Sequence, residues 1–469
     1  MQLTIGEIAA ILGASPAGAP RTVRGYSIDS RTVEAGDLFF AIRGPRFDGH
    51  DFIGIALEKG AAGAVVEESY QAQRAREAAA LIRVPDTSRA LQRLAHVVRQ
   101  RWGGRVVGIT GSGGKTTTKE MIAAALATRY CTLKSPGNLN NHYGVPLTLL
   151  RLSPEHEIAV IEMAMSGPGE IAMLADLAEP QTGVVTNVSP AHLEFFDSIE
   201  AIAVAKRELI EHLSPPSCAV LNHDDPKVRE FARGFRGRVI TFGLNEGADY
   251  RATRIHTLNS AQGEIPITDF EVEGPMYTGR FSIPLPGRHN VENALAAIAT
   301  ASLFLVPAAG LRSALAATRP PGQRTEILAL PHNITLINDA YNSNPRAMQR
   351  MIETLAIWPR AARRLVVAGE MLELGPASPD WHRRIGRDLA QAEVAWLLAV
   401  RGDARFFLEG AIEAGFPSSR SRFFEEAEEC GRFCRAIAEP GDVILVKGSR
   451  GVGLERAIEV LKASFATAQ

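Results

Sequence analysis

The sequence predicts an α/β protein of three domains, two of which contain parallel sheets. Short strands rich in β-branched residues alternate with helices from about residue 105 onward, and a second alternating set follows residue 330. This alternation is typical of a parallel sheet that helices cover on both faces. The length of 469 residues also suits about three domains of ordinary size.

Two breaks in the pattern predict the domain boundaries. Val84-Pro85-Asp86 indicates a domain boundary, and the Pro- and Gly-containing stretch "TRPPGQRTE" near residue 320 indicates a linker. The predicted domains are therefore residues 1–84, 85–318 and 319–469. In the first domain, "GDLFFAIRG" and "AAGAVVEE" each contain a predicted strand.

The remaining elements follow from apolar runs and helical periodicity. In the central domain the pattern predicts strands at 106–109, 158–161, 184–186 and 218–222, and helices at 87–101, 115–129, 198–213 and 289–305. A polar, turn-rich region near 245–285 interrupts the alternation and predicts a small antiparallel insertion. In the last domain the predicted strands are 334–338, 365–368, 395–400 and 443–446, which favours a separate Rossmann-like unit.

Composition excludes several classes of protein. Lys and Arg number 51 against 52 Asp and Glu, for a net charge of −1, so no global basic field attracts nucleic acid. The sequence contains no stretch of 18 uninterrupted apolar residues, so a membrane span is not expected, and the first residues do not resemble a secretory signal. The four cysteines are too scattered for a disulfide framework. We expect a cytoplasmic protein that does not bind nucleic acid.

A glycine-rich loop follows the first strand of the alternating set. In "VVGITGSGGKTTTKEM" it precedes a helix, so backbone N–H groups and the helix N-terminus can bind phosphate. Lys115 is expected at the β- and γ-phosphates and Thr116 at Mg²⁺. Ile109 stands where the strict phosphate-loop pattern requires glycine; the glycines are spaced Gly108, Gly111, Gly114. We predict that ATP is bound by Gly111, Ser112, Gly113, Gly114, Lys115, Thr116 and Thr117.

Two further side chains follow strands of the same predicted sheet. Glu162 ends the strand 158–161, and His192 lies in "TNVSPAHLE" after the strand 184–186. Ligands of open α/β sheets bind at the carboxyl ends of strands, and a carboxylate with an imidazole suits Mg²⁺ or Mn²⁺. The alternative interpretation is a helix N-terminal charge for Glu162 and an ordinary loop histidine for His192.

Six motifs in this order resemble the Mur ligase family. They are "GITGSGGKTT", "SPGNLNNHYGVPLTLL", "IEMAMSGPGEI", "TNVSPAHLEFF", "GRHNVENALAA" and "NDAYNSNP", and the similarity extends to the N-terminal "SIDSRTVEAGDLFFAIRGPRFDGHDFI". The resemblance implies a UDP-sugar-binding domain at 1–84, an ATP-binding domain at 85–318 and a Rossmann-like domain at 319–469 that contacts nucleotide and dipeptide. It implies ATP-dependent addition of D-alanyl-D-alanine to UDP-N-acetylmuramoyl-tripeptide through an acyl phosphate, by an enzyme that we expect to be a monomer.

The resemblance also implies roles for individual residues. Those expected at the UDP-sugar peptide or the dipeptide are Asp29, Ser30, Arg31, Asn138, Asn141, Tyr341, Asn342 and Asn344. Those expected at ATP, beyond the loop, are Asn290, Asn293, Arg324 and Asp339, with His289 on the same helix face as Asn293. An N-cap with a surface ion pair is the alternative for residues 29–31, and a plain capping role is the alternative for Asn290. The segments Gly369–Gly375 and Val446–Gly451 follow strands and are expected near the same site.

Lys206 falls on an apolar stripe of the predicted helix 198–213. Ile199, Ile202, Leu209 and Leu213 make this stripe at helical spacing. A lysine there either packs its stem and extends its ammonium outward or pairs with a carboxylate. The resemblance implies instead a carbamylated lysine, which with Thr116, Glu162 and His192 would hold Mg²⁺. Lys115, Glu162, His192 and Lys206 are therefore the predicted catalytic residues.

Two other functions remain open from the sequence. One is a different amide ligase of the same superfamily, which adds a diamino acid or extends a folate with glutamate. The stretch "DAYNSNP" and the N-terminal domain argue against these. The other is an ATPase switch in which hydrolysis changes partner binding, because a phosphate loop by itself does not define a reaction.

Overall fold

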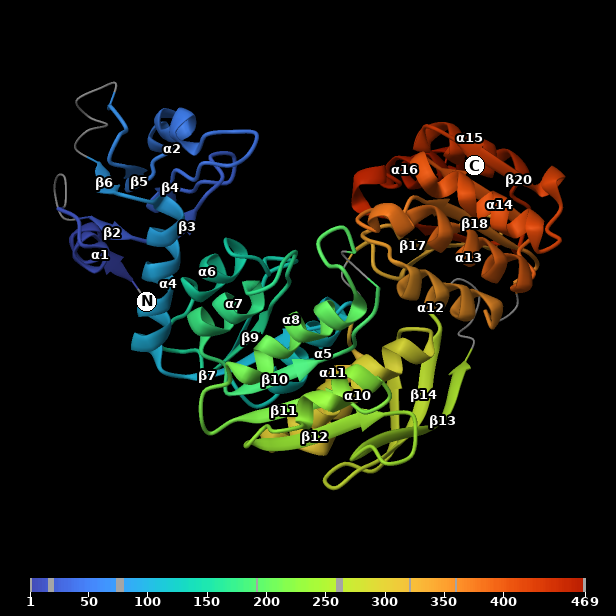
Figure 1. Cartoon of the computed structure of the whole chain (residues 1–469), viewed down its shortest axis with the longest axis horizontal. Coiled ribbons are helices and arrows are strands. Elements are labelled where there is room, and N and C mark those ends of the chain that lie inside the picture. The colour runs from blue at the N-terminus through green and yellow to red at the C-terminus, as the bar shows by residue number, and fades with distance from the viewer. Residues whose placement is uncertain are drawn as a thin grey trace.

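The computed structural model describes residues 2–15, 21–72, 80–190, 193–258, 265–319, 322–358 and 361–466. The predicted α/β class is confirmed: three groups of sheet and helix follow one another along the chain (Figure 1). Among these residues, no helix is both long enough and apolar enough to span a bilayer.

The N-terminal group contains a parallel four-stranded sheet in the order β3-β4-β5-β6. Its strands are β3 (Gly25–Ser27), β4 (Asp37–Phe40), β5 (Gly63–Glu67) and β6 (Leu81–Val84), and its helices are α1 (Ile5–Leu12) and α2 (Ile53–Glu58). β1 (Leu3–Thr4) and β2 (Thr22–Val23) form a separate antiparallel pair. β4 and β5 lie within the two segments where the sequence predicted strands, whereas β3 and β6 lie outside them and were not predicted.

Helix α4 (Thr87–Trp102) connects the first two groups. Asp86 caps its N-terminus by accepting a hydrogen bond from Arg89 N–H at 2.9 Å, and Gly103 ends it with φ 69°. Its buried apolar side chains belong to one cluster that includes residues of both neighbouring groups, such as Leu38 and Ile161. The N-terminal sheet is therefore packed onto the central one through this helix.

The central sheet has nine strands in the order β15-β14-β13-β12-β11-β10-β7-β9-β8. From β8 to β13 all neighbours are parallel, and β14 is antiparallel to both of its neighbours, β13 and β15. The strands are β7 (Arg105–Thr110), β8 (Thr132–Lys134), β9 (Ile158–Glu162), β10 (Thr182–Val185), β11 (Cys218–Asn222), β12 (Arg238–Gly243), β13 (Tyr250–Leu258), β14 (Ile267–Glu273) and β15 (Gly279–Ile283). The predicted antiparallel segment thus exists, but it extends the central sheet, because β13 pairs with β12.

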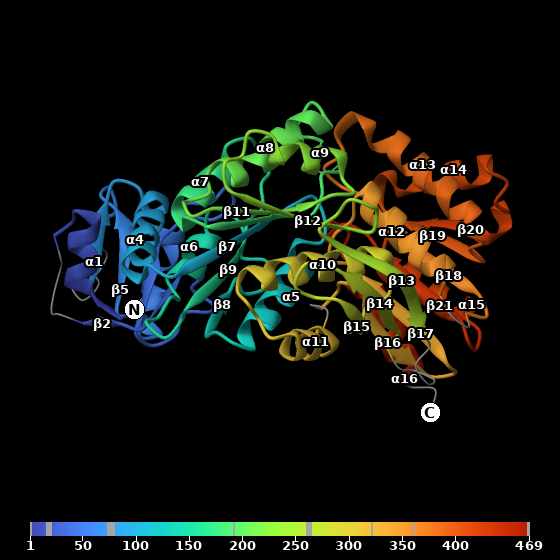
Figure 2. The same ribbon diagram turned by 90° about the horizontal axis from the view of Figure 1, so that it is seen from below.

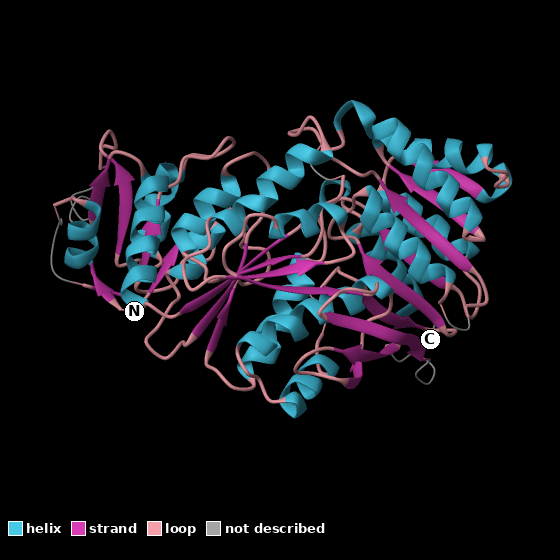
Figure 3. Ribbon diagram, turned by 60° about the horizontal axis from the view of Figure 1, so that its bottom comes forward, coloured by secondary structure: helices cyan, strands magenta, loops and turns pink. Residues whose placement is uncertain are grey.

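Helices cover both faces of this sheet (Figure 3). One face packs against α5 (Lys115–Ala127), α10 (Arg288–Leu303) and α11 (Ala308–Ala316). The other packs against α4, α6 (Gly144–Leu149), α7 (Glu170–Ala178) and α8 (Ile199–Glu211), and the short α9 (Pro226–Arg229) follows β11. Because the strands are parallel here, β7, β9 and β10 all end at the same edge, where α5 begins.

The C-terminal group has a six-stranded sheet in the order β16-β17-β21-β18-β19-β20, parallel except for β16. Its strands are β16 (Glu326–Leu330), β17 (Ile334–Asp339), β18 (Arg364–Gly369), β19 (Trp396–Val400), β20 (Ser421–Phe424) and β21 (Val443–Lys447). Helices α12 (Pro345–Ala356), α13 (Ser378–Gln391) and α14 (Arg405–Glu413) cover one face, and α15 (Ala427–Ile437) and α16 (Glu455–Ala466) cover the other. Figure 2 shows the three groups in a row, with α12 of the last group facing α10 of the central one.

Candidate active site

The glycine-rich loop occupies the turn between β7 and α5, as the sequence predicted. At Gly111, with φ 149°, an added Cβ would lie 1.9 Å from Thr186 Oγ1, and at Gly114, with φ 80°, it would lie 2.4 Å from Asn293 Oδ1. No side chain fits at either position. Lys115, the first residue of α5, donates from Nζ to the Gly111 carbonyl at 2.8 Å. Burial lowers its pKa, which Glu162 opposes and Arg324 reinforces.

The loop is held by residues that follow β10. Gly113 N–H donates to Asn187 Oδ1 and Asn187 Nδ2 donates to the Gly113 carbonyl, both at 3.0 Å. The Ser112 hydroxyl donates to the Ser189 carbonyl at 3.1 Å and accepts from Ser189 N–H at 3.0 Å. These contacts fix the loop backbone, so the N–H groups that would meet a phosphate are positioned without ligand.

Glu162 lies at the end of β9, only 1% exposed, directly beside the loop. Its Oε1 accepts from Thr116 Oγ1 at 3.1 Å and from Asn140 Nδ2 at 2.7 Å. Its Oε2 has no hydrogen-bond partner among the described residues, and the nearest cation is Lys119 Nζ at 3.7 Å. A carboxylate oxygen that has no hydrogen-bond partner and lies close to a hydroxyl fits a divalent cation that prefers oxygen ligands.

The described residues contain no cluster of three or more His, Cys, Asp or Glu side chains arranged to hold a metal. His192, which was predicted to be one of the metal ligands, lies outside the described residues. Lys206 is 2% exposed and belongs to the buried face of α8 with Ile202 and Leu209. Its pKa lies well below the ordinary value because of burial and, secondarily, the charge of Lys115. No described carboxylate lies within ion-pair distance of it, so neither the outward-pointing nor the paired lysine is observed.

The first turns of α10 form a second wall of the site. Asn293 Oδ1 accepts from Thr118 Oγ1 at 3.2 Å, and Asn293 Nδ2 donates to Asn290 Oδ1 at 3.2 Å. Asn290 Nδ2 also donates to the Pro286 carbonyl at 2.8 Å, but no described side chain caps the N-terminus of α10, so the capping interpretation is wrong and Asn290 lines the pocket. His289 is half-buried beside Arg350 and Lys447, and desolvation lowers its pKa to about 3. The imidazole is therefore neutral at pH 7.

Residues of the C-terminal group close the site from the opposite side. Arg324 lies over the Tyr341 ring, with 4.1 Å from the guanidinium carbon to the ring centroid. Asp339, at the end of β17, accepts from Thr325 N–H at 2.8 Å and pairs with Lys447, which also donates to the Asn342 carbonyl at 3.0 Å.

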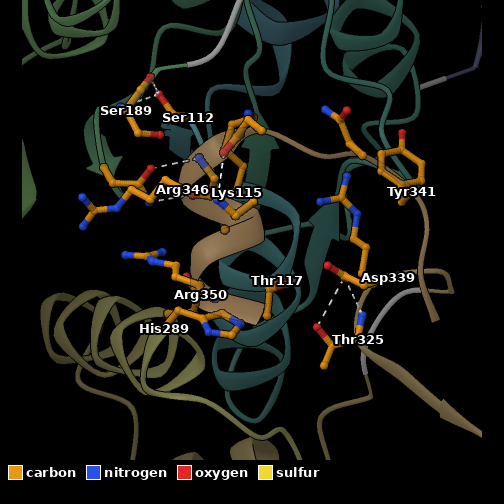
Figure 4. Close-up of a pocket in the computed structure, with 18 of the residues that line it drawn as sticks. Ser112, Lys115, Thr117, Ser189, His289, Thr325, Asp339, Tyr341, Arg346 and Arg350 are labelled. Atoms are coloured by element: carbon orange, nitrogen blue, oxygen red, sulfur yellow. Dashed lines mark hydrogen bonds between the residues drawn. The ribbon is translucent and has the colours of Figure 1, made fainter. Parts of the chain in front are cut away.

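These walls enclose one pocket between the central and C-terminal groups, with a cavity volume of about 260 Å³ (Figure 4). In this view Lys115 lies between a side formed by His289, Arg346 and Arg350 and a side formed by Thr325, Asp339 and Tyr341. Of the residues singled out from sequence, those that line it are Ser112, Gly113, Gly114, Lys115, Thr117, Glu162, His289, Asn290, Asn293, Arg324, Asp339, Tyr341, Asn342 and Asn344. Gly111 and Thr116 belong to the same loop without lining the cavity.

Other predicted residues lie elsewhere. Asn138 and Asn141 are exposed and do not line the pocket; Asn141 Oδ1 accepts from Gly144 N–H at 2.9 Å at the start of α6. Their neighbour Asn140 reaches the pocket instead. Asp29 and Arg31 form a two-pronged ion pair after β3 in the N-terminal group, with Arg31 86% exposed, and Ser30 lies between them.

The sequence interpretation missed several pocket residues. The polar ones are Asn140, Asn187, Ser189, Thr325, Arg346 and Arg350, and Lys447 was expected only as part of the segment Val446–Gly451. Asn187 and Lys447 end or follow parallel strands, so the rule that found Glu162 applies to them as well. Arg346 and Arg350 lie one turn apart on α12 and carry no comparable sequence signal. Of the two loops expected near the site, Val446–Gly451 supplies Lys447, and Ser449 Oγ of that loop accepts from Leu372 N–H of the Gly369–Gly375 loop at 2.9 Å.

Comparison with known proteins covers the whole chain. Three family descriptions match: "Mur ligase family, catalytic domain" over residues 22–99, "Mur ligase middle domain" over 109–301 and "Mur ligase, glutamate ligase domain" over 323–450. The chain is 35% identical to the UDP-N-acetylmuramoyl-tripeptide–D-alanyl-D-alanine ligase of Bacillus subtilis, over 96% of this chain and 95% of that protein. It is 38% identical to the ligase of the same name from Synechocystis, over 94% and 92%.

Solved structures agree with the sequence relatives. MurF from Acinetobacter baumannii superposes with a TM-score of 0.86 at 29% identity and covers 99% of both chains. MurF ligase from Thermotoga maritima in complex with ADP superposes with a TM-score of 0.81 at 29% identity, covering 95% of this chain and 99% of that one. With matches in all three domains and relatives above 30% identity over nearly its full length, the chain is an ATP-dependent enzyme that forms carbon–nitrogen bonds, and it belongs to the Mur ligase family.

Proposed function

We propose that this enzyme joins D-alanyl-D-alanine to the terminal carboxylate of UDP-N-acetylmuramoyl-tripeptide and converts ATP to ADP and phosphate. The observation that carries the proposal is the two-domain pocket, in which a preformed phosphate loop faces polar side chains that end strands of another domain. Relatives that bear the name of this reaction align with both walls of the pocket.

The chemistry needs two steps. A carboxylate is a poor electrophile, so its oxygen first takes the γ-phosphoryl group of ATP, which releases ADP and forms an acyl phosphate. The amine of the dipeptide then attacks the acyl carbon, the carbon–oxygen bond to phosphate breaks, and phosphate and a proton leave. Both steps demand in-line placement and neutralised charge, which Lys115 and Arg324 supply from opposite walls of the pocket.

The metal site fits Mg²⁺ by the chemistry of its donors. Thr116 Oγ1 and Oε2 of Glu162, which accepts no hydrogen bond from the described residues, would hold it, with His192 and a carbamylated Lys206 as further members of the set. Bound there, Mg²⁺ supplies positive charge to the phosphate oxygens. The buried Lys206 favours this assignment because carbamylation requires a neutral amine, and burial lowers the pKa of this one.

We assign substrates to domains as follows. Residues 1–84 bind the UDP-sugar, with Asp29, Ser30 and Arg31 as contacts, residues 85–318 bind ATP, and residues 319–469 contact nucleotide and dipeptide. On the C-terminal side, Asp339 meets the ribose, while Tyr341, Asn342 and Asn344 meet the dipeptide. In this assignment the tripeptide extends from the N-terminal domain to the pocket, where its carboxylate meets the γ-phosphate. Because an acyl phosphate hydrolyses in water, we expect the C-terminal domain to close further when all substrates bind.

An amine-acceptor assay tests the function. ADP release is measured with UDP-N-acetylmuramoyl-tripeptide and, in turn, D-alanyl-D-alanine, L-lysine, diaminopimelate or no amine. One ADP per peptide bond, with the dipeptide required, is the expected result. Efficient use of a single amino acid with the dipeptide inert would indicate a different ligase of the family, and ADP release without either substrate would indicate an ATPase switch.

A further inference from the structure

The two helices that carry much of the pocket come from different domains and are joined by a buried ion pair. Arg350 Nη2 of α12 lies 2.6 Å from Glu292 Oε2 of α10, and each side chain is only 15% exposed. Among the described residues, this is the ion pair that links the central domain to the C-terminal domain. Glu292 immediately precedes the pocket residue Asn293, and Arg350 itself lines the pocket.

The surroundings make the pair more than a surface contact. Burial raises the pKa of Glu292, which Arg350 and Arg346 oppose, and burial lowers the pKa of Arg350, which Glu292 opposes. Each charge is thus desolvated and depends on the other. Unlike an exposed pair, a buried one is weakly screened by salt, and removing one partner leaves an uncompensated charge.

Close packing beside the pair fixes the same two helices. An added Cβ at Gly287, the residue before α10, would lie 2.5 Å from Thr354 Oγ1 of α12. The start of α10 and the last turn of α12 therefore approach without room for a side chain. A second contact lies farther off, where Glu194 N–H donates to the Glu373 carbonyl at 3.1 Å.

We propose that Glu292 and Arg350 are positioning residues for the ligase reaction, whose ion pair sets the place of α12 against α10. Through α12 the pair brings Asn344 and Arg346 to the pocket, opposite the phosphate loop. The proposal rests on the proposed function, because it assigns the pair to the alignment of ATP with the carboxylate. Neither residue is assigned a direct contact with substrate.

A double-mutant cycle tests this coupling. Glu292→Gln, Arg350→Met and the double variant are compared with wild type in ATP turnover, in binding of a fluorescent ADP analogue without other substrates, and in the radius of gyration by small-angle scattering. Arg383→Met is the matched control, because Arg383 pairs with Glu409 at 2.9 Å within the C-terminal domain. Thermal unfolding shows whether each variant is folded.

Each single variant is expected to lower kcat/KM for ATP on the order of 100-fold, as a displacement of about 1 Å does. The double variant should lose no more than the worse single variant, since the pair acts as a unit. The analogue should bind more weakly and the radius of gyration should rise in both singles, while the control stays within about two-fold of wild type. If a single variant does not fold, the swap Glu292→Arg with Arg350→Glu replaces it, and recovery to within about ten-fold of wild type is expected.

Two results would overturn the proposal: single variants that match wild type, or losses that multiply in the double variant, so that the loss at Arg350 persists in full when Glu292 is already Gln. The second result would make Arg350 a ligand contact. Failure of the proposed function is separable, because wild type would then lack ligase turnover while nucleotide binding and scattering still report on the pair.

Discussion

Replacing Lys115 with Met should separate activity from stability. Lys115 is the first residue of α5, so its charge opposes the positive end of the helix dipole, at a cost of about 0.3–1 kcal/mol. Its hydrogen bond to the Gly111 carbonyl at 2.8 Å contributes about 0.5–1.5 kcal/mol. These terms oppose each other, and the half-buried ammonium is already partly desolvated. The unfolding free energy without nucleotide should therefore change by less than about 1 kcal/mol.

Turnover should fall far more. Lys115 is expected to meet charge on the transferring phosphoryl group, and loss of one such preorganised contact costs about 10²–10³ in kcat, or about 2.7–4 kcal/mol. A coupled assay of ADP release measures kcat and KM, and denaturant unfolding followed by circular dichroism measures stability.

Lys119→Met is the contrasting variant on the same helix. Lys119 is fully buried, donates to the Ser135 and Gly137 carbonyls at 2.8 and 2.7 Å and lies 3.2 Å from Glu120. Removing it should cost about 3 kcal/mol of stability or more, because buried partners are left unpaired. The assignment of Lys115 to the chemistry would be refuted by kcat within ten-fold of wild type, or by a stability loss like that of Lys119→Met.

Three more predictions follow from the site. Lys206→Ala should be strongly impaired, and millimolar short carboxylates should partly restore it by occupying the vacated space; full activity in the unrescued variant, or a charged ammonium detected by NMR, would argue against carbamylation. Because the pKa of His289 is lowered to about 3, the unfolded chain binds a proton below about pH 6.5 that the folded chain does not, so stability is lost as pH falls from there toward 3. Between pH 7 and 4.5 wild type should lose about 1 kcal/mol more than His289→Gln, after allowance for the ring's partial exposure; equal pH slopes in denaturant unfolding would contradict this. Asp29→Ala should raise KM for the UDP-sugar peptide with little change in kcat, since it lies outside the ATP pocket; a fall in kcat alone would place its role elsewhere.

The sequence by itself determined the local elements and the phosphate chemistry. β11 spans Cys218–Asn222 as predicted, α5 begins at Lys115 as predicted, and the burial of Lys206 follows from its place on an apolar stripe. These features depend on residues within one or two turns of each other, and periodicity reports them directly. The order of the six motifs added the family, and with it the expectation that Arg324 and Asp339 share a site with the loop.

Only the tertiary structure decided which distant segments meet. The antiparallel strands β13–β15 join the central sheet because β13 pairs with β12, and in the C-terminal sheet β17 pairs with β21, the last strand of that sheet in the sequence. Asn140 lines the pocket while Asn138 and Asn141 do not. This difference depends on the path of one loop, since neighbouring amides have the same sequence signal. The contact of Glu292 with Arg350 joins residues 58 apart on helices of separate domains. Such contacts are set by how domains pack, and local sequence preference carries no information about that packing.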